Sequence, residues 1–160
     1  MARAGQAVKM TYSYRYPRPT VTADVAVLRL TAVPEILLVR RSKPPFKSSW
    51  ALPGGFMEME ETLEQAARRE LLEETGITAG ELIRFDTYDA PGRDPRGRTI
   101  TQVFVMIWNE EMGTPVAGSD AKELAWFVLT SLPELAFDHS LIIRDVIRML
   151  KEGTGGSPEP

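Results

Sequence analysis

Short apolar runs recur along the chain, and several have the composition of β-strands. Residues 21–30 (VTADVAVLRL) and 35–40 (EILLVR) are rich in β-branched and aliphatic side chains, and Pro34 stands between them. Such runs, separated by a residue that interrupts strands, predict paired strands. Further runs of the same character, each predicted to be a strand, cover residues 81–89, 99–109 and 123–129.

Near the start of the chain, apolar and polar residues alternate. The apolar positions are Val8, Met10, Tyr12, Tyr14 and Tyr16. A period of two is typical of a strand with one buried face, so we predict a further strand over residues 8–16. If this strand lies at the edge of a sheet, pairing of that open edge with a second copy would give a homodimer.

Two segments carry helical signals. The first covers residues 62–75, where Thr62 and Gln65 have the spacing of a capping box and Gly76 can end the helix in the left-handed conformation. The second covers about residues 138–151. Because strands outnumber helices in a mixed order, we expect an α/β fold with one mixed β-sheet covered on both faces by helices.

The length and composition bound the possible classes of protein. A chain of 160 residues suits a single domain over residues 1–160, with residues 1–7 and the tail 153–160 (GTGGSPEP) expected to be flexible. The net charge of −3 lacks the basic footprint of a nucleic-acid binder. There is no cysteine to form disulfides, thiolate ligands or a nucleophile, and no apolar stretch long enough for a membrane span or a signal peptide. We therefore expect a soluble, cytoplasmic protein with neither nucleic-acid nor membrane partners.

The first predicted helix carries a group of acidic residues. At 3.6 residues per turn, Glu70, Glu73 and Glu74 share one face of this helix with small alanines. Like charges at this spacing destabilise a helix, and acids near its C-terminal end oppose the helix dipole. One interpretation is a solvated acidic face neutralised by neighbouring arginines; the other is a cleft-lining face that holds a cation, for which Mg²⁺ or Mn²⁺ would be suitable.

The acids follow a tight turn at a fixed distance. Gly55, which closes the segment SSWALPGG, is followed after five residues by Glu61 and after seven more by the group Arg69, Glu70 and Leu71. The pattern then continues with Glu73, Glu74, Gly76 and Ile77. This 23-residue stretch resembles the signature of the Nudix hydrolases at every fixed position.

The resemblance implies a fold and a set of site residues. The fold is a Nudix-type α/β/α sandwich with a mixed central β-sheet. Glu70 and Glu74 would be the main metal ligands, with contributions from Glu73 and from the carbonyl of Gly55. Glu61 and Arg69 would pair with each other and orient the helix and the loop. The implied reaction is metal-dependent hydrolysis of a diphosphate linkage in a nucleoside diphosphate derivative.

The general base is left open by the sequence. Glu73 is one candidate, and Asp120, in the loop GSDAKE before the strand at 123–129, is another, although an acid in such a loop is more often a turn or cap residue. The single histidine, His139, follows Asp138, which has the character of an N-cap, so we expect a structural role for it. Arg41 stands beside Arg40 at the end of a predicted strand, where it is either solvated or in contact with phosphate.

A basic turn between two predicted strands is the best guide to the substrate. The segment RDPRGR presents Arg93, Arg96 and Arg98, which either bind phosphate or form an exposed basic hairpin tip. Together with LAFDH before the last helix, it resembles the ADP-ribose pyrophosphatase branch of the Nudix family. This implies ADP-ribose as substrate, AMP and ribose 5-phosphate as products, and a homodimer.

Two alternatives use the same signature. One is a pyrophosphohydrolase of nucleoside triphosphates, including oxidised dGTP, which would differ in the base and sugar pocket. The other is an ADP-ribose-sensing ligand-binding domain, as in transcription regulators that carry an additional DNA-binding domain. We expect the enzyme, because every acid of the signature is present and no basic module is visible.

Overall fold

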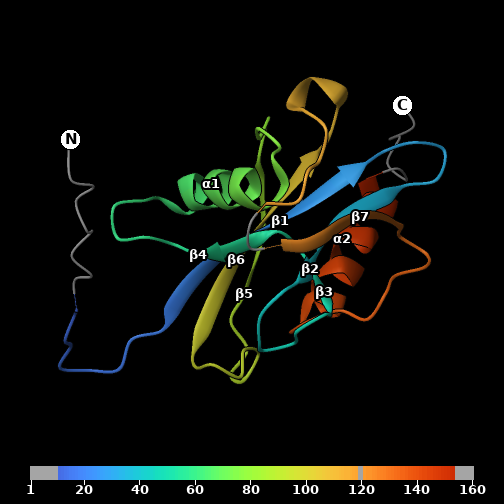
Figure 1. Cartoon of the computed structure of the whole chain (residues 1–160). Helices are drawn as coiled ribbons and strands as arrows, with labels where there is room; N and C mark the ends of the chain where they lie inside the picture. The colour runs from blue at the N-terminus through green and yellow to red at the C-terminus, as the bar shows by residue number, and fades with distance from the viewer. Residues whose placement is uncertain (1–10, 119–120, 154–160) are drawn as a thin grey trace, which may run out of the picture.

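The computed structural model describes residues 11–118 and 121–153, which form one seven-stranded sheet between two α-helices (Figure 1). The elements are β1 (Thr20–Arg29), β2 (Glu35–Arg41), β3 (Trp50–Ala51), β4 (Gly54–Phe56), α1 (Leu63–Thr75), β5 (Ile83–Tyr88), β6 (Thr99–Ile107), a 3₁₀ turn η1 (Glu110–Met112), β7 (Ala121–Val128) and α2 (His139–Gly153).

Strand β1 lies at the centre of the sheet. It runs parallel to β6 from the pair Thr20 and Thr99 to the pair Leu28 and Ile107. Its other edge is divided between two antiparallel partners, β4 near its start and β2 near its end. The sheet continues from β2 to β3 and β7, and from β6 to β5, all antiparallel. The sheet is therefore mixed, as predicted.

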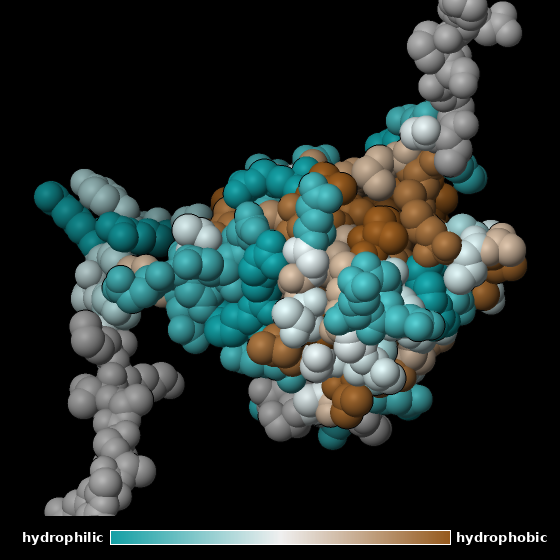
Figure 2. Space-filling model, turned by 90° about the horizontal axis from the view of Figure 1, so that it is seen from above, coloured by the Kyte–Doolittle hydropathy of each residue, from teal (hydrophilic) through white to brown (hydrophobic). Residues whose placement is uncertain are grey.

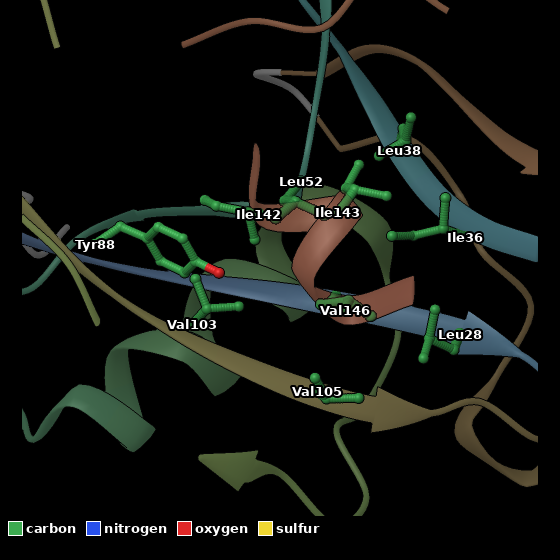
Figure 3. Close-up of a cluster of buried hydrophobic side chains, with 11 residues drawn as sticks. Leu28, Ile36, Leu38, Leu52, Tyr88, Val103, Val105, Ile142, Ile143 and Val146 are labelled. Carbon is green, nitrogen blue, oxygen red and sulfur yellow. The ribbon is translucent and has the colours of Figure 1, made fainter. Parts of the chain in front are cut away.

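The two helices cover opposite faces of this sheet, and the pattern of β1 explains why both faces need cover. Ala26 and Leu28 belong to the apolar cluster under α2, whereas Val25 and Val27 belong to the cluster under α1. A strand that is buried on both faces reads as a continuous apolar run. Figure 3 shows the cluster under α2, which includes Leu28, Val103, Val105, Ile142, Ile143 and Val146. The predicted α/β/α sandwich is confirmed.

Helix α1 is delimited by the predicted signals. The backbone N–H of Gln65 donates to Thr62 Oγ1 at 3.2 Å, and Gln65 Oε1 accepts from the Thr62 N–H at 2.8 Å, which together make a capping box. At the other end, Gly76 has a φ of 70° and donates its N–H to the carbonyl of Leu72. Helix α2 extends to Gly153, the first residue of the tail predicted to be flexible; residues 1–7 and 154–160 lie outside the described residues.

The predicted strand over residues 8–16 is the main correction. Residues 8–10 lie outside the described part, and residues 11–19 belong to no strand. Tyr12, Tyr14 and Tyr16 have exposed fractions of 48%, 43% and 70%, so the alternation does not separate a buried face from an open one. Pro17 and Pro19 follow directly, and proline has no N–H to donate to a neighbouring strand. No helix among the residues described here is long and apolar enough to cross a membrane.

Candidate functional site

A pocket opens where the edge of β1 passes from β4 to β2. Its lining comes from β1, the end of β2, the β3–β4 turn, α1, the loop between β5 and β6, and the start of α2. The charged residues in this lining include Asp24, Arg41, Arg69, Glu70, Glu74, Arg93, Asp94 and Arg96. Seen from above, the molecule shows a broad hydrophilic area beside an apolar one (Figure 2). The pocket therefore brings acidic and basic side chains from distant parts of the sequence together.

The acidic part of the pocket is built on α1. Glu70 and Glu74 face inward, one turn apart, whereas Glu73 is exposed and accepts a hydrogen bond from Arg69 at 3.3 Å. Burial raises the pKa of the Glu74 carboxyl to about 8, and the negative charges of Glu70 and Asp24 add to this rise. Burial also raises the pKa of Glu70. The three sequence-predicted acids thus differ: Glu70 and Glu74 line the pocket and are partly desolvated, whereas Glu73 is exposed and is not part of the pocket lining.

Two glycines let the backbone of β4 pass next to these acids. The N–H of Gly54 donates to Glu74 Oε2 at 2.9 Å, and a Cβ at this position would collide with Asp24 and with the carbonyl of Ala23. A Cβ on Gly55 would lie 2.5 Å from the carboxylate of Glu70. The close approach of backbone to carboxylates explains why the turn before α1 contains glycines.

Arg69 ties the helix to its surroundings. Its Nε donates to Glu61 Oε1 at 2.5 Å, its Nη1 to Glu70 Oε1 at 2.7 Å and its Nη2 to the carbonyl of Phe56 at 3.0 Å. The hydrogen bond from Arg69 lowers the pKa of Glu61. The expected pairing of Glu61 with Arg69 is therefore present, and it joins the loop before α1, the helix and β4.

Asp24 is a pocket residue that the sequence reading missed. It is 7% exposed, lies on β1 opposite Gly54, and accepts a hydrogen bond from Thr101 Oγ1 at 2.5 Å. A carboxylate inside a strand that is otherwise buried and apolar is costly unless a partner compensates for it. The aspartate in the run VTADVAV was the available signal.

The acidic side chains suit a hard divalent cation by their chemistry, since carboxylate oxygens are its preferred ligands. In the described residues, no group of three or more histidine, aspartate or glutamate side chains is already arranged around one point. The reason is that Glu70 and Glu74 each direct an oxygen to a protein donor, Arg69 and the Gly54 N–H. The donor set fits a cation, and its carboxylates must turn to surround one.

The pocket also has basic lining residues. Arg41, at the end of β2, donates its Nε to the carbonyl of Pro45 at 2.8 Å. Burial lowers the pKa of Arg41, and the positive charge of Arg96 lowers it further. Arg96 donates its Nε and Nη2 to the two oxygens of Asp94 at 3.0 and 2.7 Å. Two guanidinium groups that repel each other inside a pocket favour an anionic ligand.

The three arginines of the basic turn have different environments. The side chain of Arg93 is only 5% exposed, and its Nε and Nη2 donate to Asp138 at 2.8 and 2.6 Å. Arg96 faces the pocket, and Arg98 is exposed and donates to the carbonyl of Asp89. The interpretation as an exposed basic hairpin tip was therefore wrong for Arg93, because its guanidinium is buried in an ion pair.

The remaining candidates are of two kinds. Asp120 lies outside the described residues, so its proposed role as a base stays a prediction. His139 is buried at the start of α2, where its Nδ1 accepts a hydrogen bond from the N–H of Leu52 at 3.0 Å. Burial lowers the pKa of His139, in keeping with the structural role expected for it. Asp138 directly precedes α2, and its carboxylate accepts from Arg93.

An α/β/α sandwich whose pocket combines carboxylates of a helix with arginines suits a ligand that carries phosphate groups together with a divalent cation. Comparison with family models agrees, because the model described as the NUDIX domain matches residues 19–150. The chain belongs to the Nudix family and, with the acids of the signature in place, is a Nudix hydrolase.

Relatives with curated descriptions include an ADP-ribose pyrophosphatase from Methanocaldococcus jannaschii, 44% identical over 133 residues, with 83% of this chain and 76% of the relative covered. The ADPR responsive transcriptional repressor NtrR from Acinetobacter baylyi is 34% identical over 143 residues. That match covers 87% of this chain but only 57% of the repressor.

Solved structures of similar fold include the Nudix domain of Shewanella oneidensis NrtR in complex with ADP ribose. This domain has a TM-score of 0.77 and 27% identity, with 84% of this chain and 90% of that chain covered. A bifunctional NMN adenylyltransferase/ADP ribose pyrophosphatase from Francisella tularensis, complexed with AMP and manganese, has a TM-score of 0.75 and 33% identity. The match covers 85% of this chain and 43% of that chain.

Proposed function

We propose that the chain hydrolyses the diphosphate linkage of ADP-ribose in the presence of Mg²⁺ or Mn²⁺. Water forms a new P–O bond, the bridging P–O bond breaks, and the proton that water loses passes to a base, giving AMP and ribose 5-phosphate. The observation that carries this proposal is that Arg41 and Arg96 line the same pocket as Glu70 and Glu74. The name of the Methanocaldococcus relative and the ADP-ribose in the Shewanella domain support the choice of substrate.

The acids and the glycine turn are proposed to hold the metal. Glu70 and Glu74 would provide the main oxygens, with Glu73 and the carbonyl of Gly55 completing the set. A divalent cation held there would neutralise phosphate charge and polarise the phosphorus for attack. Glu61 and Arg69 fix the position of α1 relative to β4, because Arg69 donates hydrogen bonds both to Glu61 and to the carbonyl of Phe56. Glu73 and Asp120 both remain proposals for the base that accepts the proton of water.

The arginines are proposed to bind the diphosphate. Arg41 and Arg96 line the same pocket as the acids, and a guanidinium can donate two hydrogen bonds to one phosphate. Arg93 was predicted to do the same, and it also lines the pocket. Its ion pair with Asp138 favours an indirect contribution, in which it anchors the loop that carries Arg96 to the start of α2.

A sensor of ADP-ribose is the second candidate, because one relative is a repressor that responds to this ligand. The third is a pyrophosphohydrolase of nucleoside triphosphates such as 8-oxo-dGTP. All three would use the same pocket. They differ in whether the bound ligand is cleaved and in which ligand is preferred.

A substrate panel tests the proposal directly. Steady-state kinetics with Mg²⁺ on ADP-ribose, NADH, diadenosine diphosphate, dGTP and 8-oxo-dGTP, with ³¹P NMR of the products, would rank the substrates. We expect ADP-ribose to have the highest kcat/KM and to yield two monophosphates. A triphosphate with a higher kcat/KM would refute the choice of substrate. Tight binding of ADP-ribose without cleavage would establish the sensor instead.

We also propose a homodimer in the cytoplasm. The strand at residues 8–16 no longer supports the dimer, but exposed tyrosines at 12, 14 and 16 do offer aromatic surface that a second copy can cover. Light scattering at micromolar concentration should give twice the mass of one chain. A monomer mass under these conditions would contradict the proposal.

A further inference from the structure

Phe137 lies in the turn before α2 and lines the pocket. It has a φ of 52°, in the left-handed region that a bulky side chain seldom adopts. Its ring and that of Phe46 are in an edge-to-face arrangement, with the ring centres 4.9 Å apart. The two residues that follow fix this turn in place: Asp138 through its ion pair with Arg93, and His139 through the N–H of Leu52.

Two guanidinium groups contact the ring of Phe137. The guanidinium carbon of Arg41 lies 4.8 Å from its centre and that of Arg96 lies 5.2 Å from it. Arg96 also lies 4.8 Å from the centre of the Phe56 ring. These distances are within the range of cation–π attraction, which is stronger where the cation is partly desolvated. One aromatic ring therefore contacts both of these arginines.

The two guanidinium groups need such support because they repel each other. The charge of Arg96 contributes to the lowered pKa of Arg41, so each group disfavours the other's positive charge. Arg41 is also held by the carbonyl of Pro45 and Arg96 by Asp94, and the ring of Phe137 adds the contact that the two guanidinium groups share. The negative face of an aromatic ring offsets part of this repulsion and limits the directions in which both groups can move.

We propose that Phe137 is a positioning residue that holds Arg41 and Arg96 together as a two-point receptor for the diphosphate. The inference rests on the proposed function for the identity of the ligand. A diphosphate carries negative charge on two adjacent phosphorus centres, so it can engage both guanidinium groups at once. Phe137 itself touches no reacting atom in this scheme. It acts through the two arginines that its ring contacts.

A purely structural reading of Phe137 makes different predictions. Its ring also packs beside the small apolar cluster of Val39, Ala51 and Ala136, where any side chain of similar volume would serve. Leucine at this position would keep apolar volume and lose the ring face, whereas tyrosine would keep both. Packing alone predicts equal results for the two variants, while support of the arginines predicts that only leucine weakens anion binding.

The experiment measures anion binding and catalysis separately. Calorimetric titration with inorganic pyrophosphate in EDTA would compare wild type, Phe137→Leu, Phe137→Tyr and the control Phe85→Leu. Phe85 packs against the cluster under α2 and is not part of the pocket lining. We expect Phe137→Leu to weaken pyrophosphate binding about tenfold, the sum of two cation–π contacts. Phe137→Tyr and Phe85→Leu should stay within about twofold of wild type. If Phe137→Leu does not fold, Phe137→Met replaces it in the comparison.

Kinetics on ADP-ribose complete the test. For Phe137→Leu we expect a KM raised about tenfold with kcat within about twofold of wild type, which is the result for phosphate contacts of equal strength in the ground and transition states. Unchanged pyrophosphate affinity in Phe137→Leu, or equal losses in the leucine and tyrosine variants, would overturn the inference. If wild type does not cleave ADP-ribose, but Phe137→Leu binds pyrophosphate more weakly than wild type and Phe137→Tyr, the proposed function is refuted and the inference about Phe137 stands.

Discussion

Gly55 and Glu70 are packed so closely that a Cβ on the glycine would lie 2.5 Å from the carboxyl carbon of the glutamate. Gly55 belongs to β4 and Glu70 to α1, so this contact sets the distance between strand and helix. It also brings the Gly55 backbone beside one of the proposed metal ligands. No side chain larger than hydrogen fits at residue 55 without a shift of Glu70.

Gly55→Ala should therefore displace the Glu70 carboxylate and abolish most of the activity. We expect a loss of about a hundredfold in kcat/KM, as when one strong stabilising contact of the transition state is removed. Gly153→Ala is the control, because a Cβ there has open space around it. Circular dichroism should show that both variants fold, and Gly55→Ala with wild-type kcat/KM would argue against a role for this contact.

Glu74→Gln tests the metal assignment. The change keeps the shape of the side chain and removes one of its charged oxygens, so we expect a folded protein with about a hundredfold less activity. Wild type should also gain thermal stability on addition of Mg²⁺, since a ligand that binds the folded state stabilises it, and Glu74→Gln should lose this gain.

Glu64→Gln is the matched control for Glu74→Gln. Glu64 lies on the same helix but points to solvent, where it forms an exposed ion pair with Arg68. Its replacement should leave both the activity and the Mg²⁺ effect unchanged. If Glu74→Gln keeps near wild-type activity in Mg²⁺, the assignment of Glu74 as a metal ligand is wrong.

Arg93→Ala separates anchoring from phosphate binding. The side chains of Arg93 and Asp138 are 5% and 16% exposed, so removing the guanidinium leaves a nearly buried carboxylate without its partner. Such a change costs about 3–5 kcal/mol of unfolding free energy. Urea unfolding should show this loss, and the double variant Arg93→Ala, Asp138→Asn should recover part of it. Arg144→Ala, at an exposed position on α2, is the control. A raised KM with unchanged stability would instead establish Arg93 as a direct phosphate contact.

The acidic part of the site was predictable because its residues lie within one helix and the turn before it. The spacing of Glu70 and Glu74 places them on one face of the helix independently of the tertiary structure. Gly54 and Gly55 precede this helix, so their proximity to the acids follows from a short connection. The acidic part of the pocket could therefore be predicted from a short segment of sequence.

The rest of the pocket depends on contacts between distant segments. Asp24 reaches the pocket through the pairing of β1 with β4, and Arg93 meets Asp138 only because the loop after β5 folds over the start of α2. No periodicity in the sequence records such contacts. The strand predicted over residues 8–16 failed for a related reason: alternation describes the character of side chains, but Pro17 and Pro19 limit the hydrogen bonds that a neighbouring strand requires.

The burial of His139 leads to a prediction of how the free energy of unfolding depends on pH. His139 is 4% exposed, and burial lowers its pKa. The nearby negative charges of Asp24 and Asp138 act to raise this pKa, and the positive charges of Arg93 and Arg41 act to lower it. In the unfolded chain His139 takes up a proton as the pH falls below about 6.5, whereas in the folded protein it does so only at lower pH. At this residue the unfolded state therefore binds more protons in this window, and the contribution of His139 to the free energy of unfolding should fall by up to about 1.4 kcal/mol per pH unit. The raised pKa of Glu74 acts in the opposite direction, because the folded protein holds a proton there over the same range, and this effect is common to wild type and to a variant at residue 139. His139→Gln offers an amide oxygen to the N–H of Leu52 and does not titrate. Between pH 7.5 and 5.5, urea unfolding should give a free energy of unfolding that becomes lower in wild type relative to this variant as the pH falls, and equal slopes for the two proteins would show that His139 does not contribute to the response.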